Sequence, residues 1–293
     1  MSSTLPSFSL SLSTLPTTVA SDKKGSQGEP TIRFTNVKEL LQMIDRVSGD
    51  YLVVTDVFPA DFNKLNRQER RPFRLRRYYA NTGTLIITIP TNLHEALHLE
   101  LYRRYEHKLA RNGQEEKWSA IGSTTFRPQG HPGGDGGEGD SSGGPNPERH
   151  YKNAWPTLVI ESGASEPLSA LQNDMKWWFS ASDHQVNIVL LTKFDRRNQK
   201  IIIERWGEEI QTREGATTTR RSAANPVYTP ILQQSITISQ NTATNPVSYN
   251  VTKGALVLSF RLLFLRDPGP QEGDFVIDIT ELQAYARAVW SYV

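Results

Sequence analysis

The sequence predicts an α+β fold in which helices flank a mixed β-sheet, and two stretches carry most of that prediction. Residues 155–206 show the pattern strand, helix, strand, strand. The run at 186–191 is apolar at nearly every position, which is typical of a central strand covered on both faces. Residues 93–111 carry apolar side chains at helical spacing. Long polar stretches separate these elements, so a single domain with disordered excursions fits better than two domains.

Composition excludes several classes of protein. The 293 residues contain no cysteine, which excludes disulfides, iron–sulfur clusters and cysteine nucleophiles and suits an intracellular protein, nuclear or cytoplasmic. No run approaches the roughly 20 apolar residues of a membrane span, so no membrane partner is expected. Residues 1–20 lack a basic start, so a secretory signal is not expected. The net charge is only +2, and nucleic-acid binding must therefore be argued from clusters of basic residues.

In the N-terminal third, the sequence predicts a disordered tail, a helix and two strands. Residues 1–30 are rich in Ser, Thr, Pro and Gly and offer too little apolar surface to offset the entropy of ordering. Asn36 is a candidate N-cap with Glu39 three residues on, and the helix it opens is stopped by Gly49. Strands are expected at 51–58 and 83–90.

The densest charge in the chain lies between these strands. Six arginines fall within eleven residues, and the later ones interleave with Phe73, Leu75, Tyr78 and Tyr79. One interpretation is a phosphate-contacting patch with stacking aromatic rings. The other is a solvated edge strand whose charges prevent pairing with another sheet. The residues concerned are Arg67, Arg70, Arg71, Arg74, Arg76 and Arg77.

The helix expected at 93–111 carries two histidines on one face. His94 and His98 are four residues apart, a spacing that can bind metal, but no cysteine or third histidine supports a zinc site. A strand is expected at 118–127. After it, residues 128–150 form a predicted flexible, glycine-rich loop, since 128–147 contain eight glycines and almost no aliphatic residue. Asp140 lies within that loop.

The stretch 155–206 places one carboxylate at the end of a buried strand. Residues 157–160 are apolar and lead directly into Glu161. A charge at that point is costly unless it is paired or holds a metal. Ser165 and Pro167 open the next helix, which contains Lys176, Trp177 and Trp178; the two tryptophans are expected to be core residues.

The C-terminal part is expected either to join the same body or to form a small appended lobe. Residues 31–230 are predicted to form the core, with a polar loop at 207–230, and residues 231–293 add strands near 235–239 and 256–264. Thr280 is expected to cap a last helix. There is no Gly-x-Gly-x-x-Gly, Walker loop, Gly-x-Ser-x-Gly or His-Glu-x-x-His motif, which argues against nucleotide-dependent, esterase and zincin functions.

The segment Trp-Pro-Thr-Leu-Val-Ile-Glu-Ser-Gly-x-Ser-Glu, the Trp-Trp helix after it and the Gly-Ser-Thr-Thr-Phe strand before it resemble a group of uncharacterised fungal proteins. That group in turn resembles the restriction-endonuclease branch of the PD-(D/E)XK superfamily, and the match covers roughly residues 36–206. The resemblance implies a restriction-endonuclease-like fold, with a mixed β-sheet flanked by helices, and a nuclease that uses Mg²⁺ (or Mn²⁺) and acts on DNA.

Carried onto this chain, the resemblance implies that Asp140 and Glu161 hold the metal. Glu95 (or Glu100) on the helix at 93–111 would be the extra carboxylate contributed by the first core helix. Two departures stand out: Gly139-Asp140 replaces the Pro-Asp dipeptide, and Gly163 stands where the motif has its lysine. Lys176 is the candidate for a lysine that has moved to the next helix and would orient the attacking water.

Each of these residues also has a plain structural interpretation. Glu161 can hydrogen-bond the N-terminus of the helix beginning near Ser165, where negative charge is favoured. Asp140 can be a solvated loop acid and Lys176 an exposed helix residue. The sequence therefore leaves two functions open: a metal-dependent nuclease acting on DNA, or a catalytically inactive protein of the same fold that binds nucleic acid or protein as a scaffold.

Overall fold

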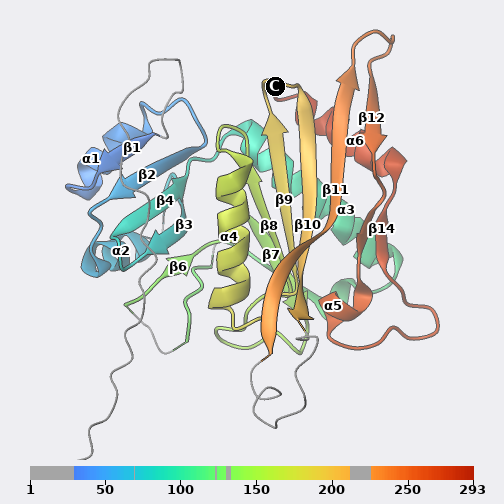
Figure 1. The fold of residues 1–293 in the computed structure, drawn as a ribbon, viewed down its shortest axis with the longest axis horizontal. Coiled ribbons are helices and arrows are strands. Elements are labelled where there is room, and N and C mark those ends of the chain that lie inside the picture. The colour runs from blue at the N-terminus through green and yellow to red at the C-terminus, as the bar shows by residue number, and fades with distance from the viewer. Residues whose placement is uncertain (1–29, 69, 123, 130–132, 212–225) are drawn as a thin grey trace, which may run out of the picture.

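The computed structural model describes residues 30–293 apart from residues 69, 123, 130–132 and 212–225. The tail predicted to be disordered lies outside the described residues up to residue 29. The described chain folds into two large mixed β-sheets with helices packed against them (Figure 1). This arrangement confirms the predicted α+β class with mixed sheets.

The N-terminal sheet has the strand order β1-β2-β4-β3-β6 and its own apolar core. Two helices accompany it, α1 (Val37–Ile44) and α2 (Pro59–Asn66). Asn36 caps α1 by accepting a hydrogen bond from the Glu39 backbone N–H at 3.0 Å, as the spacing predicts. Helix α2 was not expected; Pro59 stands in its first turn and Phe62 is buried. The strands are β1 (Thr31–Arg33), β2 (Tyr51–Thr55), β3 (Arg74–Tyr79), β4 (Thr84–Thr88) and β6 (Gly136–Gly137).

The larger sheet has the order β12-β11-β10-β9-β8-β7-β5. Within it only β8 and β9 run parallel, and helix α4 (Leu168–Ala181) forms the crossover between them. The strands at 231–252 belong to this sheet, so that part of the C-terminal segment adds to the same body. The strands are β5 (Trp118–Ile121), β7 (Ser141–Pro145), β8 (Leu158–Gly163), β9 (Ile188–Asp195), β10 (Lys200–Gln211), β11 (Val227–Asn241) and β12 (Ser248–Thr252).

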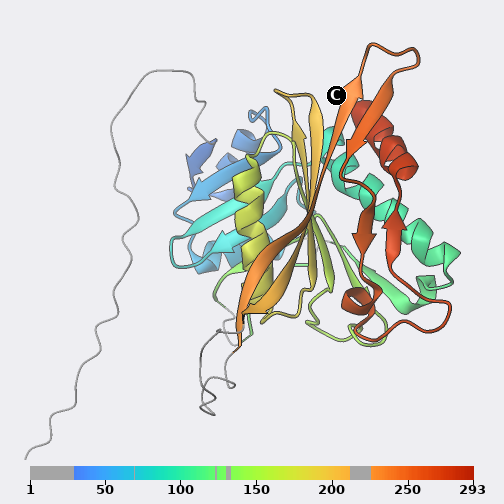
Figure 2. The same ribbon diagram turned by 45° about the vertical axis from the view of Figure 1, so that its right-hand side comes forward.

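Helices cover both faces of the larger sheet (Figure 2). Helix α4 packs on one face, where Met175 and Trp178 join a core with the side chains of β8 and β9. Helices α3 (Asn92–Arg111) and α6 (Ile279–Trp290) cover the other face and contact each other. Helix α3 also contacts β8. Its N-terminal turns carry His94, Glu95 and His98, which take part in the candidate site.

The prediction of a flexible glycine-rich loop at 128–150 was wrong for residues 136–145. Residues 136–145 supply β6 and β7, and all ten are buried. Glycine is required there by close approach of neighbours: a Cβ on Gly137 would lie 1.9 Å from Nη1 of Arg77, and one on Gly143 would lie 2.5 Å from Nε1 of Trp118. The absence of aliphatic residues reflects tight packing around the backbone.

The prediction of a single strand at 256–264 was also wrong in part. The segment divides into β13 (Leu256–Leu258) and the short helix α5 (Phe260–Phe264), because Phe260, Leu263 and Phe264 are buried at helical spacing. Strand β13 pairs with β14 (Phe275–Ile277), and a 3₁₀ turn (Glu115–Lys117) precedes β5. Asp278 caps α6 with Glu281 in a reciprocal pair, two residues before the expected cap. Within the described ranges, no helix is long and apolar enough to cross a membrane.

Candidate functional site

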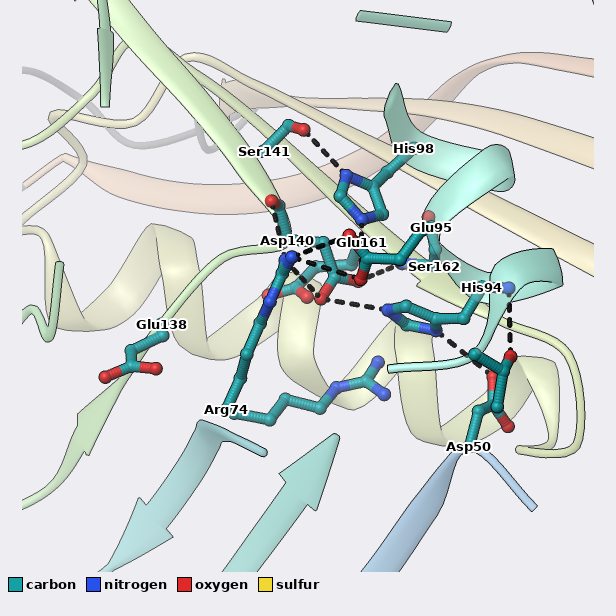
Figure 3. Close-up of polar contacts among 12 residues, drawn as sticks. Asp50, Arg74, His94, Glu95, His98, Glu138, Asp140, Ser141, Glu161 and Ser162 are labelled. Carbon is teal, nitrogen blue, oxygen red and sulfur yellow. Dashed lines mark hydrogen bonds and ion pairs between the residues drawn. The ribbon is translucent and has the colours of Figure 1, made fainter. Parts of the chain in front are cut away.

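Strand pairing brings Asp140 and Glu161 together. Strands β7 and β8 are antiparallel with Ser141 opposite Ile160, so Asp140, just before β7, lies beside Glu161 (Figure 3). The backbone N–H of Ser162 donates to Oδ2 of Asp140 at 2.8 Å. Asp140 is 9% exposed and Glu161 is fully buried, so neither is a solvated loop acid.

Helix α3 adds a third carboxylate. Thr91 caps the helix by accepting from the His94 backbone N–H, which places Glu95 in the first turn, facing β3. The guanidinium of Arg74 lies between Glu95 and Asp140: Nη2 is 2.9 Å from Oε2 of Glu95, and Nη1 donates to the carbonyl oxygen of Asp140 at 2.9 Å. Figure 3 shows Arg74 reaching from its strand to this point. Glu100, the alternative to Glu95, instead pairs with arginines of its own helix.

Glu161 lies among partners that hold one of its oxygens and leave the other unpaired. Oε1 accepts from Trp178 Nε1 and lies 3.2 Å from Nη2 of Arg77. Oε2 is buried and has no hydrogen-bond partner among the described residues. Burial, and next the charge of Asp140, raise the pKa of Glu161 to about 8. The tryptophan expected to be a plain core residue is thus also a hydrogen-bond donor to the candidate site.

His94 is a buried cation between two carboxylates. Its Nδ1 lies 3.1 Å from Oδ2 of Asp50 and its Nε2 lies 3.2 Å from Oδ1 of Asp140. Burial opposes the charged ring, but Asp140 and Asp50 raise the pKa of His94 to about 10. Although burial opposes their ionisation as well, the bonds to His94 hold the pKa of both carboxyls well below its usual range. Asp50 also accepts from the backbone N–H groups of Ala164 and Ser165, at 2.6 and 2.8 Å.

His98 completes a group of possible metal ligands with His94 and Glu95, since ligand atoms of the three lie within 4.8 Å of one another. Nδ1 of His98 lies 2.8 Å from Oγ of Ser141, and Nε2 lies 3.4 Å from Oε1 of Glu95. Both ring nitrogens of His94 already lie within 3.2 Å of carboxylate oxygens, those of Asp50 and Asp140. Among the described residues, the group is therefore better explained as part of an ion-pair network than as a zinc site.

Four of the six clustered arginines turn inward. Strand β3 has a bulge between Arg74 and Arg77, so Arg76 and Arg77 both reach the interior instead of alternating across the strand. Arg76 pairs with Glu166 and Asp174, and Arg77 pairs with Asp174 and Glu161. Arg71 pairs with Glu138 at 2.7 Å.

The structure therefore does not assemble the six arginines into one phosphate-contacting surface. Arg76 and Arg77 are 1% and 0% exposed and are already neutralised by carboxylates. Arg67 and Arg70 remain exposed, and Arg74 borders a cavity. Charge and spacing alone cannot reveal this outcome, because the paired carboxylates stand between 21 residues away, as at Arg74 and Glu95, and 98 residues away, as at Arg76 and Asp174.

The lysine predicted to orient water is not at the site. Lys176 is exposed, on the face of α4 opposite the buried Trp178 that bonds Glu161. The parallel pairing of β8 with β9 instead sets Lys193 opposite Gly163, but its Nζ donates to the carbonyl of Ala164 at 2.6 Å. Burial lowers the pKa of Lys193, and its carboxylate neighbours are Asp50 and Glu166. Among the described residues, no lysine pairs with Glu161.

The buried groups form one carboxylate cluster with more acids than bases. Its acids are Asp50, Glu95, Asp140, Glu161, Glu166 and Asp174, and its cations are Arg74, Arg76, Arg77 and the charged His94. Even with Lys193 counted at its edge, negative charge is in excess. Burial raises the pKa of Glu166 to about 8, because its effect is larger than the opposite effect of the Arg76 charge. Burial also raises the pKa of Glu161 to about 8. In this state protons make up the missing positive charge.

A cavity of about 460 Å³ leads to this cluster from the surface. Arg74 and Asp140 line it, together with Tyr102 and Arg103 of α3 and Ala120 of β5. A ligand entering the cavity would thus meet Asp140 and Arg74 first. Glu161 lies behind them.

Comparison with known proteins finds a distant structural likeness. No protein-family model matches the chain, and no curated protein matches it. Among solved structures, the chain is similar to a protein of Anabaena variabilis described as "a putative nuclease belonging to DUF820". The sequence identity is 12%, the TM-score is 0.35, and the likeness covers 58% of this chain and 94% of that chain.

Proposed function

We propose that the chain is a metal-dependent nuclease that acts on DNA and holds Mg²⁺ or Mn²⁺ with Asp140, Glu161 and Glu95. The observation that carries the proposal is that Asp140 and Glu161 lie side by side where β7 pairs with β8, next to a cavity, with Glu95 linked to Asp140 through Arg74. Hard oxygen donors of this kind are the ligands that Mg²⁺ prefers.

Two further features fit a divalent cation. Among the described residues, Oε2 of Glu161 is buried and has no hydrogen-bond partner, which suits an oxygen that ligates a cation. The cluster also has an excess of negative charge that protons balance at Glu161 and Glu166, and a divalent cation could replace those protons.

The residues around the metal position have separable roles. When bound, Mg²⁺ would supply Lewis-acid activation of the phosphodiester and of the attacking water. Arg74, at the cavity wall, can exchange its carboxylate contacts for a phosphate group, which matches its planar fork of donors. His94 and the Ser162 backbone N–H hold Asp140 in place, and Trp178 orients Glu161. These last groups are positioning residues.

A second candidate is a catalytically inactive protein of the same fold that serves as a binding scaffold. The guanidinium of Arg74 lies between Glu95 and Asp140, where it neutralises two of the proposed metal ligands. Lys176 faces solvent, so the lysine of the nuclease motif has no counterpart at Glu161. Both features favour a structural ion-pair network, and the experiment below separates the two functions.

The test combines metal binding with cleavage. Titration calorimetry with Mn²⁺, and cleavage of a labelled DNA in Mg²⁺ or Mn²⁺, would compare the wild type with Glu161→Gln and Asp140→Asn. Glu148→Gln, at an exposed acid outside the cluster, is the control. The proposal expects binding and cleavage in the wild type and control, and at least a hundred-fold loss in the two variants with the melting temperature retained. If the wild type neither binds Mn²⁺ nor cleaves DNA, only the scaffold function remains. If Glu161→Gln and Asp140→Asn both still cleave DNA, these residues are not the metal ligands.

A further inference from the structure

A second, larger hollow lies on the other side of the edge strand β5. Its volume is about 1140 Å³, and its described lining comes from residues 119–122, which include the end of β5, from residues 124–129 and from residues 149–155. Its floor is formed by Phe126 and Trp155, whose rings stack with centroids 5.1 Å apart and which are 5% and 2% exposed. No residue of the carboxylate cluster is among the described residues that line this hollow.

The described wall of the hollow carries cations and no acid. Arg127, Arg149 and Lys152 contribute to it, and none of the described residues that line it is an aspartate or glutamate. The chain as a whole has nearly equal numbers of basic and acidic residues, 33 and 31. Such segregation of charge is therefore a local feature, and it favours a polyanionic ligand.

Arg149 is fixed in place by neutral groups. It donates to the side-chain and backbone oxygens of Gln185, so these contacts leave its charge in place and the guanidinium loses little freedom on meeting an anion. Arg127, on the other stretch, donates to Oδ1 of Asn63 at 2.8 Å, and its guanidinium lies 4.7 Å from the ring centre of Phe62.

An exposed aromatic ring stands at the rim. Tyr151 is 59% exposed and is followed by the exposed Lys152, for which no ion pair is found among the described residues. An aromatic ring next to a lysine offers a surface for stacking a base beside a contact for its phosphate. The pair lies outside the core, so replacing either residue is not expected to affect folding.

The hollow adjoins the candidate active site. It shares Ala120, Ile121 and Gly122 with the smaller cavity that contains Arg74 and Asp140. A chain-like ligand could therefore pass over the edge of β5 from one to the other. A double helix, about 20 Å across, cannot enter a hollow of this size, whereas a few nucleotides of a single strand can.

We propose that this hollow binds single-stranded nucleic acid, with Tyr151 stacking on a base and Lys152, Arg127 and Arg149 contacting phosphates, and that it leads the strand to Asp140. The choice of ligand rests on the proposed nuclease function. Binding itself does not require catalysis, so it can be measured without metal.

The test is fluorescence anisotropy of a labelled fifteen-nucleotide oligo-dT in EDTA, over a series of salt concentrations. Tyr151→Ala should weaken binding roughly five- to hundred-fold with the salt slope unchanged, and Tyr151→Phe should restore it. Lys152→Ala should weaken binding several-fold and reduce the salt slope by about 1. Lys38→Ala, at an exposed lysine of α1, is the control and should change nothing.

Four results would overturn the inference: no binding of oligo-dT, equal binding by the variants at Tyr151 and Lys152, equal binding of a blunt duplex, or equal competition by poly-glutamate. A separate cleavage assay in Mn²⁺ distinguishes this failure from failure of the proposed function. If oligo-dT binds as expected but is never cleaved, the binding role of the hollow is supported and the nuclease function is refuted. If DNA is cleaved and the kinetics do not change on substitution of Tyr151 or Lys152, the nuclease function is supported and the binding role of the hollow is refuted.

Discussion

The excess of carboxylates predicts that the folded protein loses stability as the pH rises from 6.5 to 8. The pKa of Glu161 and of Glu166 is raised to about 8, from an ordinary value of 4.5, so the folded state binds more protons than the unfolded state throughout this window. The pKa of His94 is raised from 6.5 to about 10, so its contribution is fully present below pH 6.5 and is lost as the pH rises toward 10. All three groups therefore act in the same direction.

The magnitude follows from the number of extra protons. One proton held only by the folded state changes the free energy of unfolding by about 1.4 kcal/mol per pH unit. The slope between pH 6.5 and 8 should thus lie between about 1.4 kcal/mol per unit, for one such group, and about 4 kcal/mol per unit, for all three. Asp50 and Asp140, whose pKa values are lowered, act elsewhere: their contribution is present above about pH 4 and is lost as the pH falls below it.

Urea unfolding followed by tryptophan fluorescence at several pH values measures this slope. Glu161→Gln should reduce the slope by about 1.4 kcal/mol per unit, whereas the exposed Glu148→Gln should leave it unchanged. Saturating Mn²⁺ should also flatten the slope if the metal replaces the protons. A stability that is constant or rises from pH 6.5 to 8 would refute the charge balance derived from the cluster, as would an unchanged slope in Glu161→Gln.

Three further predictions concern single residues. Asp174→Asn should lower the free energy of unfolding by about 3–5 kcal/mol in urea titrations, because it leaves two buried arginines without their shared carboxylate. Asp195→Asn, at the half-buried end of β9, should cost less than about 1 kcal/mol. Gly137→Ala should destabilise by at least about 1–3 kcal/mol, since its Cβ would overlap a buried guanidinium and the backbone, whereas Gly122→Ala, with open space around it, should be near neutral in melting temperature. Arg74→Ala should tighten Mn²⁺ binding measured by calorimetry, because it removes the cation between two proposed ligands; weaker binding would indicate that Arg74 helps to hold the site together.

Local patterns were sufficient for most of the elements. Apolar periodicity located the long helix at 92–111 and the central strand near 188–191, and the Asn36 cap formed as its spacing predicted. The failures have a common cause. Gly136–Gly137 and the strand after it were mistaken for a loop because glycine and serine carry no apolar signal, although close contact with Arg77 and Trp118 is what requires them.

The candidate site was predictable only as a set of residue types. A glutamate at the end of a buried strand marked Glu161, and the family resemblance drew attention to Asp140 and Glu95. The sequence contained no sign that Asp50 and Asp140 hold His94 between them. Asp50 is 44 residues from His94 and lies just before strand β2, whereas His94 is in helix α3. Lys176 was misjudged because helical phase turns it to solvent, two positions before the tryptophan that contacts Glu161.

The sequence by itself determined where most of the strands and helices lie and that a carboxylate stands at the end of a core strand. These properties depend on residues within a few positions of each other, and periodicity and capping report them directly. Only the tertiary structure decided that the arginine-rich stretch faces inward, that six carboxylates, five of them buried, share one cluster, and that the cationic hollow lies next to it. Their partners are distant in sequence, and burial, which sets both the pKa of Glu161 and the cost of each unpaired charge, exists only once the two sheets have packed together.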